Sequence, residues 1–403
     1  MNKKIAAAVT SAALVLGSTA ANAGIIIPAG EWTLDVNGNV NVYASVVNLD
    51  DSTAVGLVSA SQNGEDKTQS INTGLLPAWL GFTGTTRQND LDVSFTISMQ
   101  PNVSDNGVAG DSASNGPLWR QAFLTFGDKS WGSVKMGKDL GIFAGNAILN
   151  DMTLLGVGAG ASLVSGNSTS LGGIGTGYIY PSWKGQISYT TPNFNGFTGT
   201  IGITNPNQSG DASQQATYQD RFGVEGQLQY AFDAGKVWAS FASYDVRNGN
   251  DAAGLQWDAT AADAGVAVNM GNLGLVAYYY TTEGVGNTMF HGYGGTVTAG
   301  SANSGVDASG NERDGDGGYI QATYVIPSGT KLGVAYGVSN LDKASSSDTA
   351  TVVEENKRWT VGAYHPLTKH LNLVAEYNNV EASNYNNQNA EMDSISLGAI
   401  LFF

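Results

Sequence analysis

Hydrophobic and polar residues alternate along most of this chain with a period of two. In residues 91–100 every odd position is apolar and every even position is polar, and the last segment, 391–403, follows nearly the same rule. Successive side chains of a β-strand point to opposite faces, so this period predicts strands with one apolar and one polar face. No sustained helical period follows the N-terminal region.

Segments of this kind predict sixteen strands. We place them at 31–47, 74–85, 90–101, 117–128, 131–138, 182–191, 196–204, 219–232, 235–247, 257–270, 272–283, 316–327, 330–341, 354–365, 370–381 and 391–403. Every second connection is short and carries turn residues, as in Asp233-Ala234-Gly235. The others are mostly long and polar, and the longest is 139–181.

Short turns at one end and long loops at the other are typical of an outer-membrane barrel. We therefore predict an all-β fold, a 16-stranded antiparallel transmembrane β-barrel, with both termini at the short-turn end. A barrel of this size leaves a lumen too wide for side chains to fill, hence a water-filled channel. The alternative is a secreted soluble β protein, but such a fold has no reason to sort its loops by length.

Composition supports a membrane protein and excludes several other classes. Charged residues make up only 13%, about half the usual share for a soluble protein. The absence of cysteine excludes disulfides and thiolate metal sites. A net charge of −16 argues against a nucleic-acid partner, because binding phosphates requires clustered Lys and Arg.

The N-terminus predicts export. Lys3 and Lys4 precede an apolar run from Ile5 to Leu16, and Ala21-Asn22-Ala23 offers small residues for cleavage. This is the layout of a secretory signal peptide, 1–23, which leaves 24–403 as a single barrel domain. No later stretch is long and apolar enough for a membrane helix.

Three motifs resemble those of the general trimeric porins of Gram-negative bacteria. They are Ala78-Trp79-Leu80-Gly81-Phe82-Thr83-Gly84, the run from Trp119 to Gly127, and the run from Trp131 to Lys138. The chain also ends in Phe403, as most of that family do. The resemblance implies a homotrimer in the bacterial outer membrane, in contact with its lipids and lipopolysaccharide. It also implies that Phe403 is the signal read by the barrel-assembly machinery.

The resemblance further implies that the third long loop, 139–181, folds into the barrel and narrows the pore. Asp151 resembles the acidic tip of that loop, and Arg120 and Lys138 match basic positions on the facing wall. Opposed charges across a narrow waist set up a field that selects solutes by charge and dipole. Lys135 and Asp139 are weaker candidates for the same waist.

Alternation places Arg120 and Lys135 on the lumen side of their strands, with Phe123, Val134 and Met136 on or near the lipid side. Trp79 stands where the family commonly has an inward arginine. The waist is therefore expected to carry weaker charge than in the family.

Together these features predict a passive diffusion channel for small hydrophilic solutes and ions, with a preference for cations because the acidic loops concentrate them. We expect no cofactor, no resident metal and no enzymatic activity. Two alternatives stay open. One is a substrate-selective porin, and the other is a surface adhesin or structural barrel whose lumen is closed by the Gly- and Ser-rich segment 156–177.

Two local motifs are weaker. Residues 132–138 fit G-x-x-x-x-G-K but lie in a strand pattern and are followed by Asp139, which argues against a nucleotide site. Asp314-Gly315-Asp316-Gly317 is a fragment of a calcium-loop pattern without its closing Glu. A flexible acidic loop, or a weakly bound divalent ion, is the expectation there.

Overall fold

The computed structural model describes residues 24–50, 53–61, 64–101, 103, 118–163, 169–205, 221–247, 255–288 and 300–403. The signal peptide predicted at 1–23 lies outside the described residues. The strands are β1 (Ile25–Ala29), β2 (Trp32–Leu49), β3 (Lys67–Asn72), β4 (Trp79–Gln88), β5 (Leu91–Gln100), β6 (Leu118–Asp128), β7 (Gly132–Leu140), β8 (Trp183–Thr190), β9 (Phe197–Thr204), β10 (Gly223–Phe232), β11 (Gly235–Arg247), β12 (Gln256–Met270), β13 (Leu273–Glu283), β14 (Asp314–Val325), β15 (Lys331–Leu341), β16 (Val353–Pro366), β17 (Leu371–Asn384) and β18 (Asn389–Phe402).

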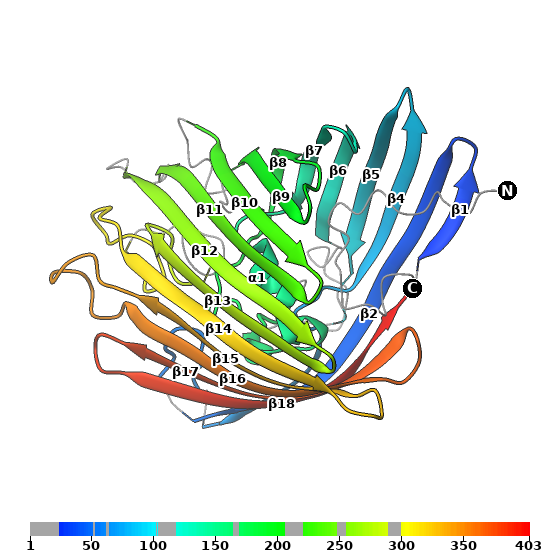
Figure 1. The fold of residues 1–403 in the computed structure, drawn as a ribbon. Helices are drawn as coiled ribbons and strands as arrows, with labels where there is room; N and C mark the ends of the chain where they lie inside the picture. The colour runs from blue at the N-terminus through cyan, green and yellow to red at the C-terminus, as the bar shows by residue number, and fades with distance from the viewer. Residues whose placement is uncertain are drawn as a thin grey trace, which may run out of the picture.

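The sheet closes on itself. Each strand from β4 to β18 pairs antiparallel with the next, and β18 returns to pair with β2, with Phe402 opposite Asn39. β3 pairs with residues 43–48 of β2, and β4 pairs with residues 33–39 on the same edge. The two short strands therefore take the place of one interrupted strand in the wall. β1 pairs with the first residues of β2 along the edge opposite β4. The wall is therefore a closed 16-stranded antiparallel barrel, as predicted (Figure 1).

The second predicted strand, 74–85, is wrong in its first half. The chain leaves the sheet between β3 and β4, because its backbone bonds to side chains of β2 instead. Asn41 accepts from the amide of Gly74 at 2.9 Å and donates to the carbonyl of Leu76 at 2.9 Å. Asn39 donates to the carbonyl of Pro77, which itself has no amide hydrogen to give a sheet.

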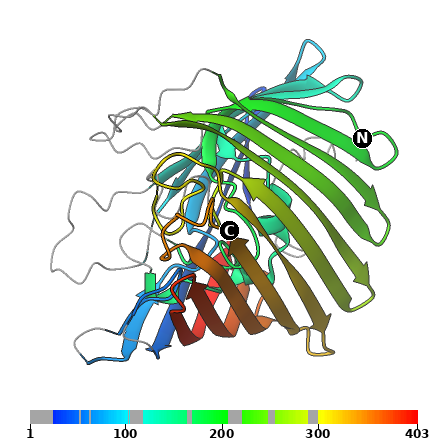
Figure 2. The same cartoon turned by 90° about the vertical axis from the view of Figure 1, so that its left-hand side faces the viewer.

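Connections are sorted by length, with one exception. Tight turns such as 89–90 and 233–234 lie at one end, and long connections such as 141–182 and 284–313 begin at the other (Figure 2). The exception is the connection from β17 to β18, which takes only residues 385–388. The C-terminal Phe403 exchanges two backbone hydrogen bonds with Gly38, at the short-turn end of β2.

The two faces of the wall differ as the alternation predicts. On β18 the outward Ile395 and Leu397 are more than half exposed, whereas the inward Ser394 and Ser396 are buried. Large apolar side chains are exposed all round the outside, for example Ile97, Leu228 and Ile320. An outer surface of this kind suits hydrocarbon rather than water. No helix among the described residues has the length and apolar character needed to cross a membrane.

The long connection between β7 and β8 folds into the barrel, where it carries α1 (Gly145–Asn150), η2 (Met152–Leu155) and η3 (Ala161–Leu163). We call residues 141–182 the inward loop. Its apolar side chains, among them Phe143, Met152 and Val157, form one cluster with inward residues of the wall such as Tyr43 and Tyr319. The hydrophobic core therefore lies inside the barrel, over one part of the lumen.

Candidate pore constriction

The inward loop begins on a buried carboxylate of the wall. Glu225 of β10 accepts hydrogen bonds from the amides of Ile142 and Phe143, at 2.6 and 3.0 Å. The same carboxylate accepts from the ammonium of Lys184 on β8 at 2.6 Å and from the hydroxyl of Tyr244. Since two backbone amides and a cation share it, Glu225 fixes the point at which the loop turns into the barrel.

A second carboxylate holds the next turn. Asp263 of β12 accepts from the amide of Ala144 at 3.2 Å and from the hydroxyl of Tyr278 at 3.0 Å. Ala144 has a φ of 57°, a left-handed conformation that an alanine adopts only when its surroundings impose it. This contact directs the chain into the short helix α1.

A third carboxylate holds the far side of the loop. Glu376 of β17 accepts from the amides of Val157 and Gly158, at 2.8 and 2.9 Å, and from the hydroxyl of Tyr364 at 2.6 Å. Glu225, Asp263 and Glu376 are all buried. These inward acidic groups therefore bind the loop backbone and do not face the open lumen.

Asp151 lies where the predicted acidic tip should be, but its side chain points to the wall. Its Oδ1 accepts from the amide of Thr153 at 2.9 Å, and its Oδ2 accepts from the hydroxyl of Tyr178 at 2.8 Å. The guanidinium of Arg358, on β16, lies 3.8 Å from the same Oδ2. Burial next to Asp151 raises the pKa of Tyr178 above its usual value, so this hydroxyl stays a donor.

The predicted basic wall is only partly where it was expected. Lys135 of β7 is inward and half-buried, and it pairs with Asp139 four residues on. The ring of Phe123 lies 4.9 Å from the Lys135 ammonium. Phe123 is therefore inward, and its predicted place on the lipid side is wrong. The register of β5 and β6 slips between Ser98 and Met99, which makes the opposite strand bulge at Arg120.

Lys138 is not brought into the lumen. It alternates with inward Asp139, is exposed, and shares the outward face with Met136. Its ammonium donates to the carbonyl of Trp119 at 2.9 Å, along the outside of the wall. The structure therefore corrects the expected position of Lys138, because strand alternation allows only one of two neighbouring residues to face inward.

Trp79 does face the lumen, at the first residue of β4 and opposite Asn39 of β2. Its indole donates to the side chain of Asn37 at 3.2 Å, and its ring meets that of Phe402 edge-on at 6.4 Å. It is half-buried. Its inward position agrees with the sequence prediction. Its contact with the Phe402 ring shows that it also packs against the wall.

Sequence reasoning missed a polar network where α1 meets the wall. Lys236 of β11 donates to Asn146 at 2.7 Å, and Asn146 donates to the side-chain oxygens of Gln227 and Gln229 of β10, at 2.9 and 3.2 Å. Lys236 and both glutamines are half-buried. The alternation of β10 predicts that Gln227 and Gln229 face inward. Their contact with Asn146 could not be predicted, because that residue lies about eighty positions earlier in the chain.

The long-loop end carries an ion pair that fixes two connections together. Arg313, just before β14, makes a bidentate contact to Asp348 at 2.8 and 2.9 Å and also donates to the carbonyl of Ser304. Both charged side chains are almost fully buried. Asp314 and Asp316 of the calcium-like fragment belong to β14, so that fragment is not one continuous loop.

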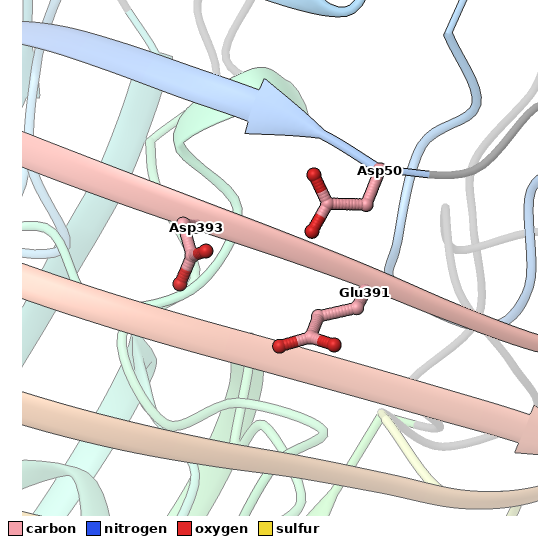
Figure 3. A group of neighbouring side chains, drawn as sticks. All are labelled: Asp50, Glu391 and Asp393. Carbon is pink, nitrogen blue, oxygen red and sulfur yellow. The ribbon is translucent and has the colours of Figure 1, made fainter.

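Three carboxylates lie close together outside the barrel near the same end. Asp50 follows β2, and Glu391 and Asp393 come from β18 (Figure 3). One oxygen of each lies within 4.8 Å of the others, which is close enough to share a divalent ion. Asn379 already donates to Glu391 at 2.7 Å and to Asp393 at 3.2 Å, so neighbouring side chains also satisfy these groups.

Comparisons with known proteins agree with this geometry. A family model described as "Gram-negative porin" matches residues 8–385. No curated protein sequence matches the chain. Among solved structures, the outer membrane channel DcaP of Acinetobacter baumannii matches at a TM-score of 0.68 and 15% identity, over 93% of this chain and 99% of that one.

Two further structures are similar. The anion-selective porin from Comamonas acidovorans matches at a TM-score of 0.64 and 16% identity, over 93% of this chain and all of that one. A Salmonella typhi OmpF complex with daunomycin matches at 0.61 and 17%, over 94% of this chain and all of that one. At such low identity these likenesses show the fold alone.

Proposed function

Because this chain belongs to the Gram-negative porin family, and so forms an outer-membrane channel rather than an enzyme, we propose that it is a passive diffusion channel for small hydrophilic solutes and ions. The mechanism is sieving by size and charge between the inward loop and the facing wall. Export through a cleaved signal peptide, 1–23, and assembly of residues 24–403 into a homotrimer belong to the same proposal.

The path of the inward loop carries this proposal. Its anchoring hydrogen bonds go to β2, β10, β12, β14 and β17, which belong to the part of the wall that runs from β10 through β18 to β2. On β4 to β7, in the other part of the wall, four inward side chains are half-buried and mostly uncharged and polar: Thr83, Thr96, Gln121 and Lys135. A polar-lined passage between these strands and the loop is what a diffusion channel requires.

The cation preference is proposed from the long-loop end, which would be the extracellular mouth. Carboxylates outnumber cations there, and Asp50, Glu65, Glu312 and Glu354 are exposed. A mouth of one sign concentrates ions of the opposite sign. Arg120 and Lys135, with Asp139 and Trp79, stay proposed lining residues, whereas Asp151 and Lys138 point elsewhere.

Single-channel current in a planar bilayer, with protein refolded from 24–403, tests the function. Steady ohmic steps, with a reversal potential of the sign that cations give in a salt gradient, would support it. Silence from protein shown to be folded and inserted would favour the closed barrel instead. That second candidate has an observation behind it, since the apolar cluster inside the barrel already fills part of the lumen.

A further inference from the structure

One lysine fixes the orientation of three amide side chains at the edge of α1. An ammonium can only donate, so the atom of Asn146 that faces Lys236 must be its oxygen. The other end of Asn146 is then its amide nitrogen, which must donate. The two atoms that receive it are therefore the oxygens of Gln227 and Gln229.

This orientation leaves several donors of the network without partners. The side-chain oxygens of Asn146, Gln227 and Gln229 each accept a hydrogen bond within the network. The amide nitrogens of both glutamines, and the remaining protons of Lys236, have no hydrogen-bond acceptor among the described residues. No carboxylate of the described chain lies within ion-pairing distance of Lys236, unlike Lys135 and Lys184.

The donors are also accessible. Lys236 and both glutamines are half-buried, whereas Asn146, which links the three, is buried. The ring of Trp238 lies 5.5 Å from the Lys236 ammonium and covers one side of it. The four side chains of this network thus come from strands β10 and β11 and from helix α1. Their remaining donors are not used within the network.

We propose that Lys236, Gln227 and Gln229 form a binding site for the carboxylate of a small organic anion that passes the inward loop. A carboxylate has two oxygens and no proton to donate, so it matches a cation flanked by amide donors. The site deepens the proposed channel function and rests on it. It lies in the lumen beside α1, apart from the acidic mouth, so local anion binding and a cation-rich mouth are compatible.

Bi-ionic reversal potentials test the site, with sodium lactate on one side and sodium chloride on the other. We expect Lys236→Met to lower the lactate-to-chloride permeability ratio about threefold to tenfold, the size of one lost hydrogen bond in a partly water-exposed site. Lys331→Met is the matched control, because Lys331 is an inward lysine packed on Tyr364 outside this network. Equal effects of the two substitutions would mean that charge alone acts, and would overturn the proposal.

Two additions keep the test decisive. Gln229→Leu removes one donor and leaves the lysine charge, so it should lower the same ratio without the risk of an unpaired Asn146. Line broadening of ¹³C-labelled lactate by the refolded protein in micelles reports binding even if the barrel does not conduct. Broadening that Lys236→Met abolishes would support the site in a silent channel. Absence of broadening with the unsubstituted protein would overturn the site while leaving the channel function intact.

Discussion

Asp151 of the inward loop and Arg358 of β16 face each other behind the loop, with 3.8 Å between the carboxylate Oδ2 and the guanidinium Nη2. Each side chain is about 1% exposed. The sequence led us to expect Arg120 and Lys138 opposite this acidic loop tip, but the cation that Asp151 meets is Arg358, on the packed side of the loop. The charge pair therefore fixes the loop in place and does not face permeating solutes.

Arg358→Met should loosen the loop. Removing one partner of a buried pair costs about 3–5 kcal/mol, because the other charge is left uncompensated. We expect a lower unfolding temperature and a larger, noisier single-channel conductance.

The isosteric Asp151→Asn is the companion variant, and it should leave the reversal potential unchanged. A large shift of the reversal potential in Asp151→Asn would show that this carboxylate reaches the passage after all.

Glu376→Gln should release the far side of the loop. Both oxygens of Glu376 accept hydrogen bonds, two from the amides of Val157 and Gly158 and one from Tyr364. A glutamine oxygen is neutral, so the hydrogen bonds from the two amides lose the charge assistance that roughly doubles their strength, a loss of about 1 kcal/mol or more. Hydrogen exchange at residues 157 and 158 should accelerate, while exchange at 142 and 143, held by Glu225, should not. Uniform acceleration at both places would contradict independent anchoring.

The strands were predictable because their signal is local. In β5, the neighbours Ile97 and Ser98 differ in polarity, and neighbouring side chains of a strand point to opposite faces. The apolar one therefore lies on the outer face and the polar one on the inner face. The break at 73–78 was not predictable, since Asn39 and Asn41 draw its backbone out of the sheet from a separate strand.

The candidate site was harder to predict, since it depends on where the inward loop runs. Residue 151 could be identified as an acid at the tip of a long loop, but its partner, Arg358, lies about two hundred residues away on an ordinary alternating strand. The bulge at Arg120 depends on the pairing of β5 with β6, and the sequence of neither strand alone predicts it.

Lys135→Gln and Lys138→Gln should behave differently although they are three residues apart. Lys135 is inward beside Asp139, whereas Lys138 binds the carbonyl of Trp119 outside. Losing the inward cation should raise the cation-to-anion permeability ratio about 1.5- to 3-fold, as expected for a partly screened charge. Lys138→Gln should leave that ratio unchanged in a potassium chloride gradient. An effect of Lys138→Gln as large as that of Lys135→Gln would place Lys138 in the lumen.

The ion pair between Arg313 and Asp348 should make the long-loop end sensitive to acid. Burial alone would raise the pKa of the Asp348 carboxyl, but hydrogen bonds from Arg313 and from the amide of Ala344 outweigh it and hold that pKa below its usual value. A lowered folded-state pKa gives stability that is present above about pH 4, the unfolded value, and is lost as the pH falls through the folded one.

Asp348→Asn should therefore lower the unfolding temperature at pH 7, by the equivalent of about 3–5 kcal/mol for a broken buried pair. The gap between the variant and the unsubstituted protein should close as the pH falls below about 4, because the acid then protonates the carboxyl that the variant lacks. Asp342→Asn removes a charge from the same connection without touching Arg313, so it should show little effect at either pH. Thermal unfolding of the three proteins across this pH range measures both expectations, and a gap that persists undiminished in acid would exclude the ion pair as its cause.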